Sequence, residues 1–179
     1  MKEVEVKVID IDRKKVEAKL NALGASKIFD GTEESVFFDY PGNPITQAKH
    51  LLRLRKEGEQ TFLTFKKYVE DYTAKVRDEF QVSVSEFEPM QRILESLGLI
   101  PFQKMVKHRT SYKFKSGVKV ELDKYSGELS HIPDLMEIEG KDIAEVQSNL
   151  ELLGFRPQDG KTWTTFELID HYSAEERKA

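Results

Sequence analysis

One pattern recurs three times along this chain: charged residues two positions apart on a short extended run, followed by a helical pattern that ends in Leu-Gly. The copies begin with EVEVK at 3–7, RDEFQ at 77–81 and EIEGK at 137–141. Side chains at positions i, i+2 and i+4 of a strand share one face. Each copy therefore predicts a strand with one charged face, followed by a helix.

The composition limits the classes of protein. With 179 residues, 39% hydrophobic and 34% charged, the chain is long enough for one large domain or two small ones and is typical of a soluble, globular protein. No apolar run approaches the roughly 18 residues of a membrane span. The absence of cysteine is typical of a cytoplasmic protein, and the net charge of -4 argues against a general nucleic-acid binder. The expected partner is a small molecule, with neither nucleic acid nor membrane.

The local patterns predict many strands and few helices. Asp12 can cap a helix over 13–23, and further helices are predicted at about 88–97 and 142–153. Strands are predicted at 2–10, 26–30, 33–40, 50–56, 61–67, 75–85, 102–108, 109–115, 117–124 and 134–140. We interpret 1–172 as a single domain of two similar halves that meet between 70 and 88, with a frayed C-terminal end at 173–179.

Most of these strands carry charges on one face and apolar side chains on the other. Some charged faces are basic and others acidic: Arg53 with Arg55, Lys107 with Arg109, Glu121 with Asp123, and Glu137 with Glu139. An antiparallel sheet could turn such a face to water. Alternatively, helices cover the apolar faces, and the charged faces line the lumen of a barrel. The three predicted helices favour the barrel, because they need apolar surface to pack against.

A lumen of this kind would contain many cations and many carboxylates. Charge that is buried without a partner is very costly. A polyanion held by Arg and Lys side chains, and joined to the carboxylates by a hard divalent cation, would satisfy both sets. Mg²⁺ takes oxygen ligands from carboxylates and phosphates, and the Arg fork suits phosphate. The charges therefore predict a triphosphate with Mg²⁺ or Mn²⁺ as the ligand.

Six motifs carry a resemblance to a known family. In chain order they are EVEVK (3–7), LRLRK (52–56), LTFKK (63–67), KHRTSY (107–112), VELDK (120–124) and MEIEG (136–140). With them the chain resembles the CYTH, or triphosphate tunnel, family, which unites class IV adenylyl cyclases and thiamine triphosphatases. The resemblance implies an α+β fold in which eight antiparallel strands form a closed, barrel-like tunnel with a polar lumen and with helices packed outside.

The resemblance also implies roles for individual residues. Mg²⁺ or Mn²⁺ would be held by Glu3, Glu5, Asp123, Glu137 and Glu139. The triphosphate would be bound by Lys7, Arg53, Arg55, Lys66, Lys107, Arg109 and Lys161, with Lys66 and Arg109 as the catalytic residues. Gln81 stands in place of an acid, so its strand is not expected to be the main metal site. Glu121 is either a metal ligand or an ion-pair partner on its strand, and we favour the ion pair.

Within the family, the segment VFFDYPGNPITQAKHLLRLR at 36–55 resembles the class IV adenylyl cyclase-like branch. Phe37 stands where many members have Tyr, which removes a hydroxyl that could help to activate water in the triphosphatase branch. Two reactions stay open: conversion of ATP to cyclic AMP and pyrophosphate, and hydrolysis of thiamine triphosphate or inorganic triphosphate. A module that binds a triphosphate or nucleotide without turnover is the alternative, and a homodimer stays open beside a monomer.

Overall fold

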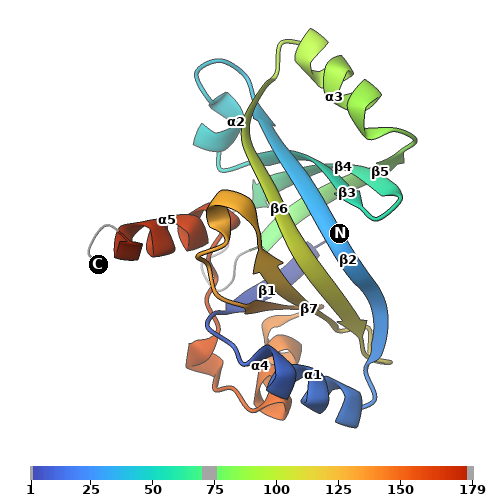
Figure 1. The fold of residues 1–179 in the computed structure, drawn as a ribbon, viewed down its shortest axis with the longest axis vertical. Coiled ribbons are helices and arrows are strands. Elements are labelled where there is room, and N and C mark those ends of the chain that lie inside the picture. The colour runs from blue at the N-terminus through green and yellow to red at the C-terminus, as the bar shows by residue number, and fades with distance from the viewer. Residues whose placement is uncertain (1, 70–75, 177–179) are drawn as a thin grey trace. The chain divides into compact units, whose positions relative to one another are not determined.

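The computed structural model describes residues 2–69 and 76–176, with side chains described from 4 to 68 and from 78 to 174. Its strands are β1 (Lys2–Val8), β2 (Ser26–Asp39), β3 (Leu51–Glu57), β4 (Gln60–Val69), β5 (Val76–Val84), β6 (Ile100–Lys113), β7 (Lys119–Tyr125) and β8 (Leu135–Gly140). Its α-helices are α1 (Arg13–Ala22), α2 (Pro44–Gln47), α3 (Phe87–Ser96), α4 (Ile143–Leu153) and α5 (Thr165–Glu176) (Figure 1). No helix of this described part is long and apolar enough to cross a membrane.

The strands are hydrogen-bonded in the order β1-β5-β4-β3-β2-β6-β7-β8, and β1 also pairs with β8. The pairs whose register is defined, such as β3 with β4 and β7 with β8, are antiparallel. The predicted α+β fold, with eight antiparallel strands and helices on the outside, is confirmed. The closed tunnel with its polar lumen stays a prediction.

Contacts divide the chain into two compact units. The first unit holds residues 1–3 and 31–107, and the second unit holds residues 4–30 and 108–179. These units differ from the two sequence halves, because β2 and β6 each run from one unit into the other. The single domain over 1–172 with two similar halves stays a prediction. The frayed end at 173–179 also stays a prediction. Helix α5 continues to Glu176, and residues 177–179 lie outside the described residues.

The core of the second unit lies under helices α1 and α4. Val4, Val6 and Val8 alternate along β1 and are buried, as the period of two predicted. They pack with apolar residues of β7 and β8 and with Leu20 and Leu150 of the two helices. The helix boundaries follow local chemistry: the Asp12 carboxylate accepts a hydrogen bond from the Lys15 amide at 3.2 Å, and Gly154 ends α4 in the left-handed conformation.

The first unit has a smaller core between α3 and strands β2 and β3. It is built on Val36, Phe38, Leu54, Leu94 and Leu99. Two local predictions were wrong here. Strand β2 is continuous where two strands were expected, and so is β6, because the ladder hydrogen bonds of a sheet override weak local breakers. Residues 41–43 form a turn that leads into the short helix α2, which has Pro44 in its first turn.

Candidate functional site

The polar face of the second unit is set by the register of three strands. Glu5 of β1 lies opposite Glu139 of β8, and Glu139 lies opposite Lys119 of β7. Directly opposed side chains on one face have Cβ atoms only about 5 Å apart, and like charges in such a pair repel. The Glu5–Glu139 pair therefore concentrates negative charge at one end of this face.

The next row of the same face joins a cation to two carboxylates. Lys7 lies opposite Glu137, which lies opposite Glu121. Lys7 is buried; its Nζ lies 2.8 Å from Glu137 Oε1 and also contacts the Glu5 carboxylate. Burial opposes the charge on Lys7, but the charges of Glu137 and Glu5 outweigh it and raise the pKa of the ammonium above its ordinary range. Lys7 therefore stays charged at neutral pH.

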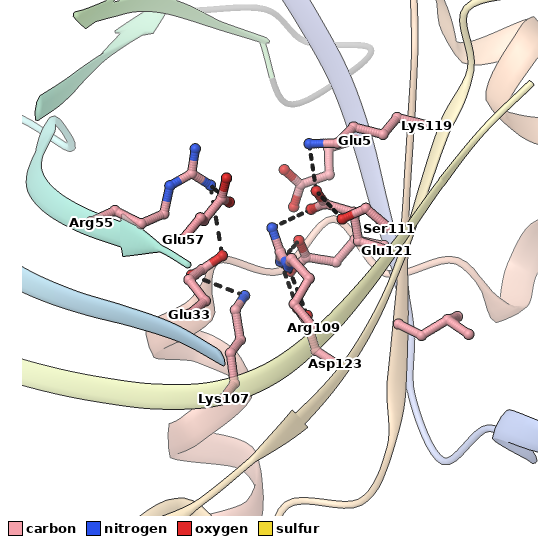
Figure 2. Close-up of polar contacts among 12 residues, drawn as sticks. Glu5, Glu33, Arg55, Glu57, Lys107, Arg109, Ser111, Lys119, Glu121 and Asp123 are labelled. Carbon is pink, nitrogen blue, oxygen red and sulfur yellow. Dashed lines mark hydrogen bonds and ion pairs between the residues drawn. The ribbon is translucent and has the colours of Figure 1, made fainter. Parts of the chain in front are cut away.

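Arg109 of β6 lies among three carboxylates. Its Nε donates to Asp123 Oδ1 at 2.7 Å, and its Nη2 donates to Asp123 Oδ2 at 2.6 Å. Nη2 also donates to Glu137 Oε2 at 2.9 Å, and Nη1 forms an ion pair with Glu121. Figure 2 shows the guanidinium between Asp123 and Glu121. With Arg109 3% exposed and Asp123 completely buried, this is a desolvated charge network.

Glu121 is an ion-pair partner, as favoured from the sequence. Besides Arg109, it lies 2.5 Å from Lys119 Nζ and accepts a hydrogen bond from the Ser111 hydroxyl at 3.3 Å. Burial alone would raise the pKa of the Glu121 carboxyl, but Arg109 and Lys119 lower it to about 2. In return, the Glu121 charge outweighs burial and raises the pKa of Lys119. Neither group changes charge near neutral pH.

The first unit carries a second polar face, with Arg55 at its centre. Arg55 Nη1 lies 3.0 Å from Glu57 Oε1 and 3.7 Å from Glu33 Oε2, and its Nη2 donates to Gln81 Oε1 at 3.1 Å. The guanidinium lies over the ring of Phe62 at 5.6 Å. Lys107 Nζ lies 3.5 Å from Glu33 Oε1 (Figure 2). Three strands, β2, β3 and β6, thus contribute charges to one buried group.

Two more basic residues belong to this face. Lys66 Nζ lies 2.5 Å from Glu79 Oε2 on the neighbouring strand β5. Arg53 lies opposite Phe37 of β2 and opposite Thr64 of β4. Thr64 donates to Gln81 Oε1 at 3.0 Å, so this amide oxygen accepts bonds from both Thr64 and Arg55. Gln81 takes part in the polar face without adding a charge.

Comparison with known proteins identifies the family. The CYTH domain family matches residues 1–172. A Methanocaldococcus jannaschii protein named a putative adenylate cyclase is 31% identical over 127 residues, which are 71% of this chain and 72% of that protein. The chain belongs to the CYTH domain family.

Solved structures share the CYTH fold. A conserved hypothetical protein from Pyrococcus furiosus has a TM-score of 0.75 at 24% identity and covers 93% of this chain and 99% of its own. A putative adenylyl cyclase from Hippeastrum, described as having a dominant triphosphatase activity, has a TM-score of 0.61 at 15% identity and covers 95% of each chain. At these identities the likeness shows the fold alone.

The predicted CYTH site residues fall into two groups. The first unit brings together Arg53, Arg55, Lys66 and Lys107. The second unit brings together Lys7, Arg109, Glu5, Asp123, Glu137 and Glu139. Lys161 forms a backbone bridge with Lys7, with its Nζ 6.0 Å from the Trp163 ring. The side chain of Glu3 lies outside the described residues. The functional roles of all these residues stay predictions.

Several residues of the polar faces were missed from the sequence, chiefly Glu33, Ser35, Glu57 and Ser111. Glu33 and Ser35 share the strand face of Phe37, and both are buried. In a strand, positions 33 and 35 lie on the face opposite Val36 and Phe38, so the period of two could have assigned them to the polar side of β2.

The donor chemistry of the CYTH site fits a hard divalent cation, because its carboxylates are oxygen ligands. Both oxygens of Asp123 accept hydrogen bonds from Arg109, whereas the Glu5 side chain is 31% exposed. Among the described residues, no group of three or more acidic, His or Cys side chains is already arranged around one metal position. The opposed pair Glu5 and Glu139 is the most accessible arrangement of two carboxylates on this face.

Proposed function

We propose that this CYTH protein is a divalent-metal-dependent enzyme that acts on small organic triphosphates, with ATP as substrate and cyclic AMP and pyrophosphate as products. The observation that carries the proposal is the burial of paired cations and carboxylates on the polar faces of the strands. Lys7 and Arg109 are each 3% exposed. Burying these charges costs desolvation free energy, and packing of the apolar core does not require it. Binding of a charged ligand would explain why these charged residues are buried.

The basic residues of the first unit suit the phosphates. Arg55 and Arg53 offer planar forks for phosphate oxygens, whereas Lys66 and Lys107 act as point charges. Lys7, Arg109 and Lys161 complete the proposed triphosphate-binding set. Such donors stabilise the charge that develops as a phosphorus–oxygen bond breaks, and this is the role we propose for Lys66 and Arg109.

The acidic residues suit the metal. We propose that Glu5, Glu137 and Glu139 hold Mg²⁺ or Mn²⁺, with Glu3 and Asp123 in the wider ligand set. A bound divalent cation would neutralise phosphate charge and help to orient the triphosphate. The opposed Glu5 and Glu139 carboxylates supply two oxygen donors on neighbouring strands, and Lys7 and Arg109 hold the two oxygens of Glu137 in place.

Phe37 supports the cyclase reaction over hydrolysis. Its ring is buried, packs 6.4 Å from that of Phe102 and has no hydroxyl with which to help activate water. In cyclisation the ribose 3′-oxygen bonds to the α-phosphorus, the bond from that phosphorus to the bridging oxygen breaks, and pyrophosphate leaves. The hydroxyl proton passes to solvent. The relative from M. jannaschii, named a putative adenylate cyclase, agrees with this choice.

Hydrolysis of thiamine triphosphate or inorganic triphosphate is the second candidate. The same polar faces would bind the phosphates whichever nucleophile attacks, and the structural neighbour from Hippeastrum is described by its triphosphatase activity. A module that binds a triphosphate without turnover is the third. The homodimer and the cytoplasmic location stay predictions.

A product assay tests the proposal. Purified protein is incubated with Mg²⁺ or Mn²⁺ and with ATP, thiamine triphosphate or inorganic triphosphate, and cyclic AMP, pyrophosphate and phosphate are measured separately. Equal amounts of cyclic AMP and pyrophosphate support the cyclase. Phosphate without cyclic AMP supports the triphosphatase, and binding without product supports the binding module. Glu5→Gln should abolish turnover, whereas Glu151→Gln on the exposed side of α4 should not.

A further inference from the structure

A buried carboxylate lies between two of the predicted triphosphate-binding cations. Glu33 is 2% exposed, and its Oε1 accepts a hydrogen bond from the Ser35 hydroxyl at 3.1 Å. Lys107 and Arg55 come from β6 and β3, the strands on either side of β2 in the sheet order. Figure 2 shows Glu33 between them, with dashed contacts to both. All these residues lie in the first unit.

The ion pairs of Glu33 are longer than those of Asp123, a buried carboxylate that Arg109 contacts. Lys107 Nζ is 3.5 Å from Oε1 and Arg55 Nη1 is 3.7 Å from Oε2, whereas Asp123 accepts from Arg109 at 2.6 and 2.7 Å. A close, two-fold hydrogen-bonded pair fixes the direction of a guanidinium. A looser ion pair supplies compensating charge without fixing the donors on one acceptor.

Arg55 is engaged elsewhere at shorter distances. It lies 3.0 Å from Glu57 and donates to Gln81 at 3.1 Å. These two partners orient the guanidinium, so Glu33 is not needed for its direction. What Glu33 adds is one negative charge beside two cations that come from different strands. Without that charge, Arg55 and Lys107 would lose a carboxylate that both of them contact in a dry environment.

We propose that Glu33 is an internal counter-ion for Arg55 and Lys107, and that its charge sets an upper limit on the affinity for triphosphate. The inference rests on the proposed function, because it takes Arg55 and Lys107 as phosphate-binding residues. Glu33 holds the two cations together in the absence of ligand and repels the phosphates that compete for them. It is a positioning residue, since it acts through these cations.

The test is binding of inorganic triphosphate, measured by titration calorimetry with a chelator present so that no metal contributes. Removing the charge with Glu33→Gln should lower the Kd roughly tenfold, because one nearby repulsive charge is lost. Glu33→Asp keeps the charge and should stay within about threefold of the unchanged protein. A purely structural role predicts the opposite sign, since a disturbed β2 would weaken binding in both variants.

Glu34→Gln is the matched control. Glu34 is the next residue of β2, faces the other way and pairs with the exposed Lys104 at 2.7 Å, so its loss should leave the Kd unchanged. If Glu33→Gln binds triphosphate equally or more weakly while the unchanged protein binds well, the inference is overturned and the proposed function stands. If the unchanged protein does not bind triphosphate in the presence of the chelator, the same comparison is made with Mg²⁺. If it binds under neither condition, the proposed function fails, and the inference with it.

A double variant covers the case in which Glu33→Gln does not fold. Glu33→Gln with Lys107→Gln removes one charge of each sign from the buried group, which keeps its balance. The double variant should bind triphosphate more tightly than Lys107→Gln alone, by roughly the same tenfold factor. Equal or weaker binding by the double variant would overturn the inference.

Discussion

Arg109 and Asp123 form a two-fold hydrogen-bonded pair between neighbouring strands. Nε and Nη2 of the arginine donate to the two carboxylate oxygens at 2.7 and 2.6 Å, and both side chains are almost completely buried. The fork geometry needs an arginine on β6 and a carboxylate on β7, so the pair fixes how these strands present their polar faces. Removing either partner leaves the other as a buried charge.

Asp123→Asn should therefore destabilise the protein. Loss of one partner of a buried pair costs about 3 kcal/mol of unfolding free energy, at the lower end of the usual range here because Glu121 and Glu137 still contact Arg109. Urea denaturation measures the change. Asp159→Asn is the control, since Asp159 forms a similar fork with the exposed Arg156 and should have a much smaller effect. Equal losses in both variants would contradict a special role for burial.

Stability should depend on the charge of Glu121 in acid. The pKa of its carboxyl falls from an ordinary 4.5 to about 2 on folding, because Arg109 and Lys119 outweigh the effect of burial. A lowered pKa stabilises the folded state above pH 4.5, and this contribution is lost as the pH falls toward 2. Urea midpoints between pH 2 and pH 6, with a chelator present, should fall more steeply for the unchanged protein than for Glu121→Gln. Parallel curves would count against this linkage.

The charge of Lys66 should contribute to triphosphate binding. Lys66 lies on the polar face of β4, where its Nζ is 2.5 Å from Glu79, whereas the next residue, Lys67, is exposed on the other face. Lys66→Gln should raise the Kd for inorganic triphosphate about tenfold to a hundredfold, and Lys67→Gln should change it little. Titration calorimetry measures both. Similar losses in the two variants would mean that binding follows total charge rather than position.

Asp39 should control the order of the segment that follows β2. Its buried carboxylate accepts hydrogen bonds from the amides of Tyr40, Ile45 and Thr46 at 2.8 to 3.0 Å and from the Thr46 hydroxyl at 2.6 Å. Burial alone would raise the pKa of Asp39, but these hydrogen bonds lower it. Asp39→Ala leaves several donors without an acceptor and should cost about 2 kcal/mol.

Hydrogen exchange locates the effect of that variant. The amides of Ile45 and Thr46 should exchange faster in Asp39→Ala, because the carboxylate is their acceptor. The amide of Leu54, in the core of the same unit, is an internal control and should keep its protection. Unchanged exchange at Ile45 and Thr46 would show that α2 holds this segment without Asp39.

Local pattern alone predicted much of the fold and part of the site. Alternation assigned Val4, Val6 and Val8 to the core and Glu5 and Lys7 to the polar face, because the period of two in a strand requires only the strand itself. The Asp12 cap and the Gly154 stop were likewise readable, since each acts within one helical turn. These features depend on residues that are close in sequence.

Only the tertiary structure decided which charges meet. The placement of Glu5 opposite Glu139, the three carboxylates around Arg109 and the position of Glu33 between Arg55 and Lys107 all depend on strands distant in sequence. A slip of one residue in any of these registers would turn a charged face into the core, so the pairing is set by burial of the apolar face of the whole sheet. The sequence by itself determined which side chains share a face, and the packing of the sheet determined their partners.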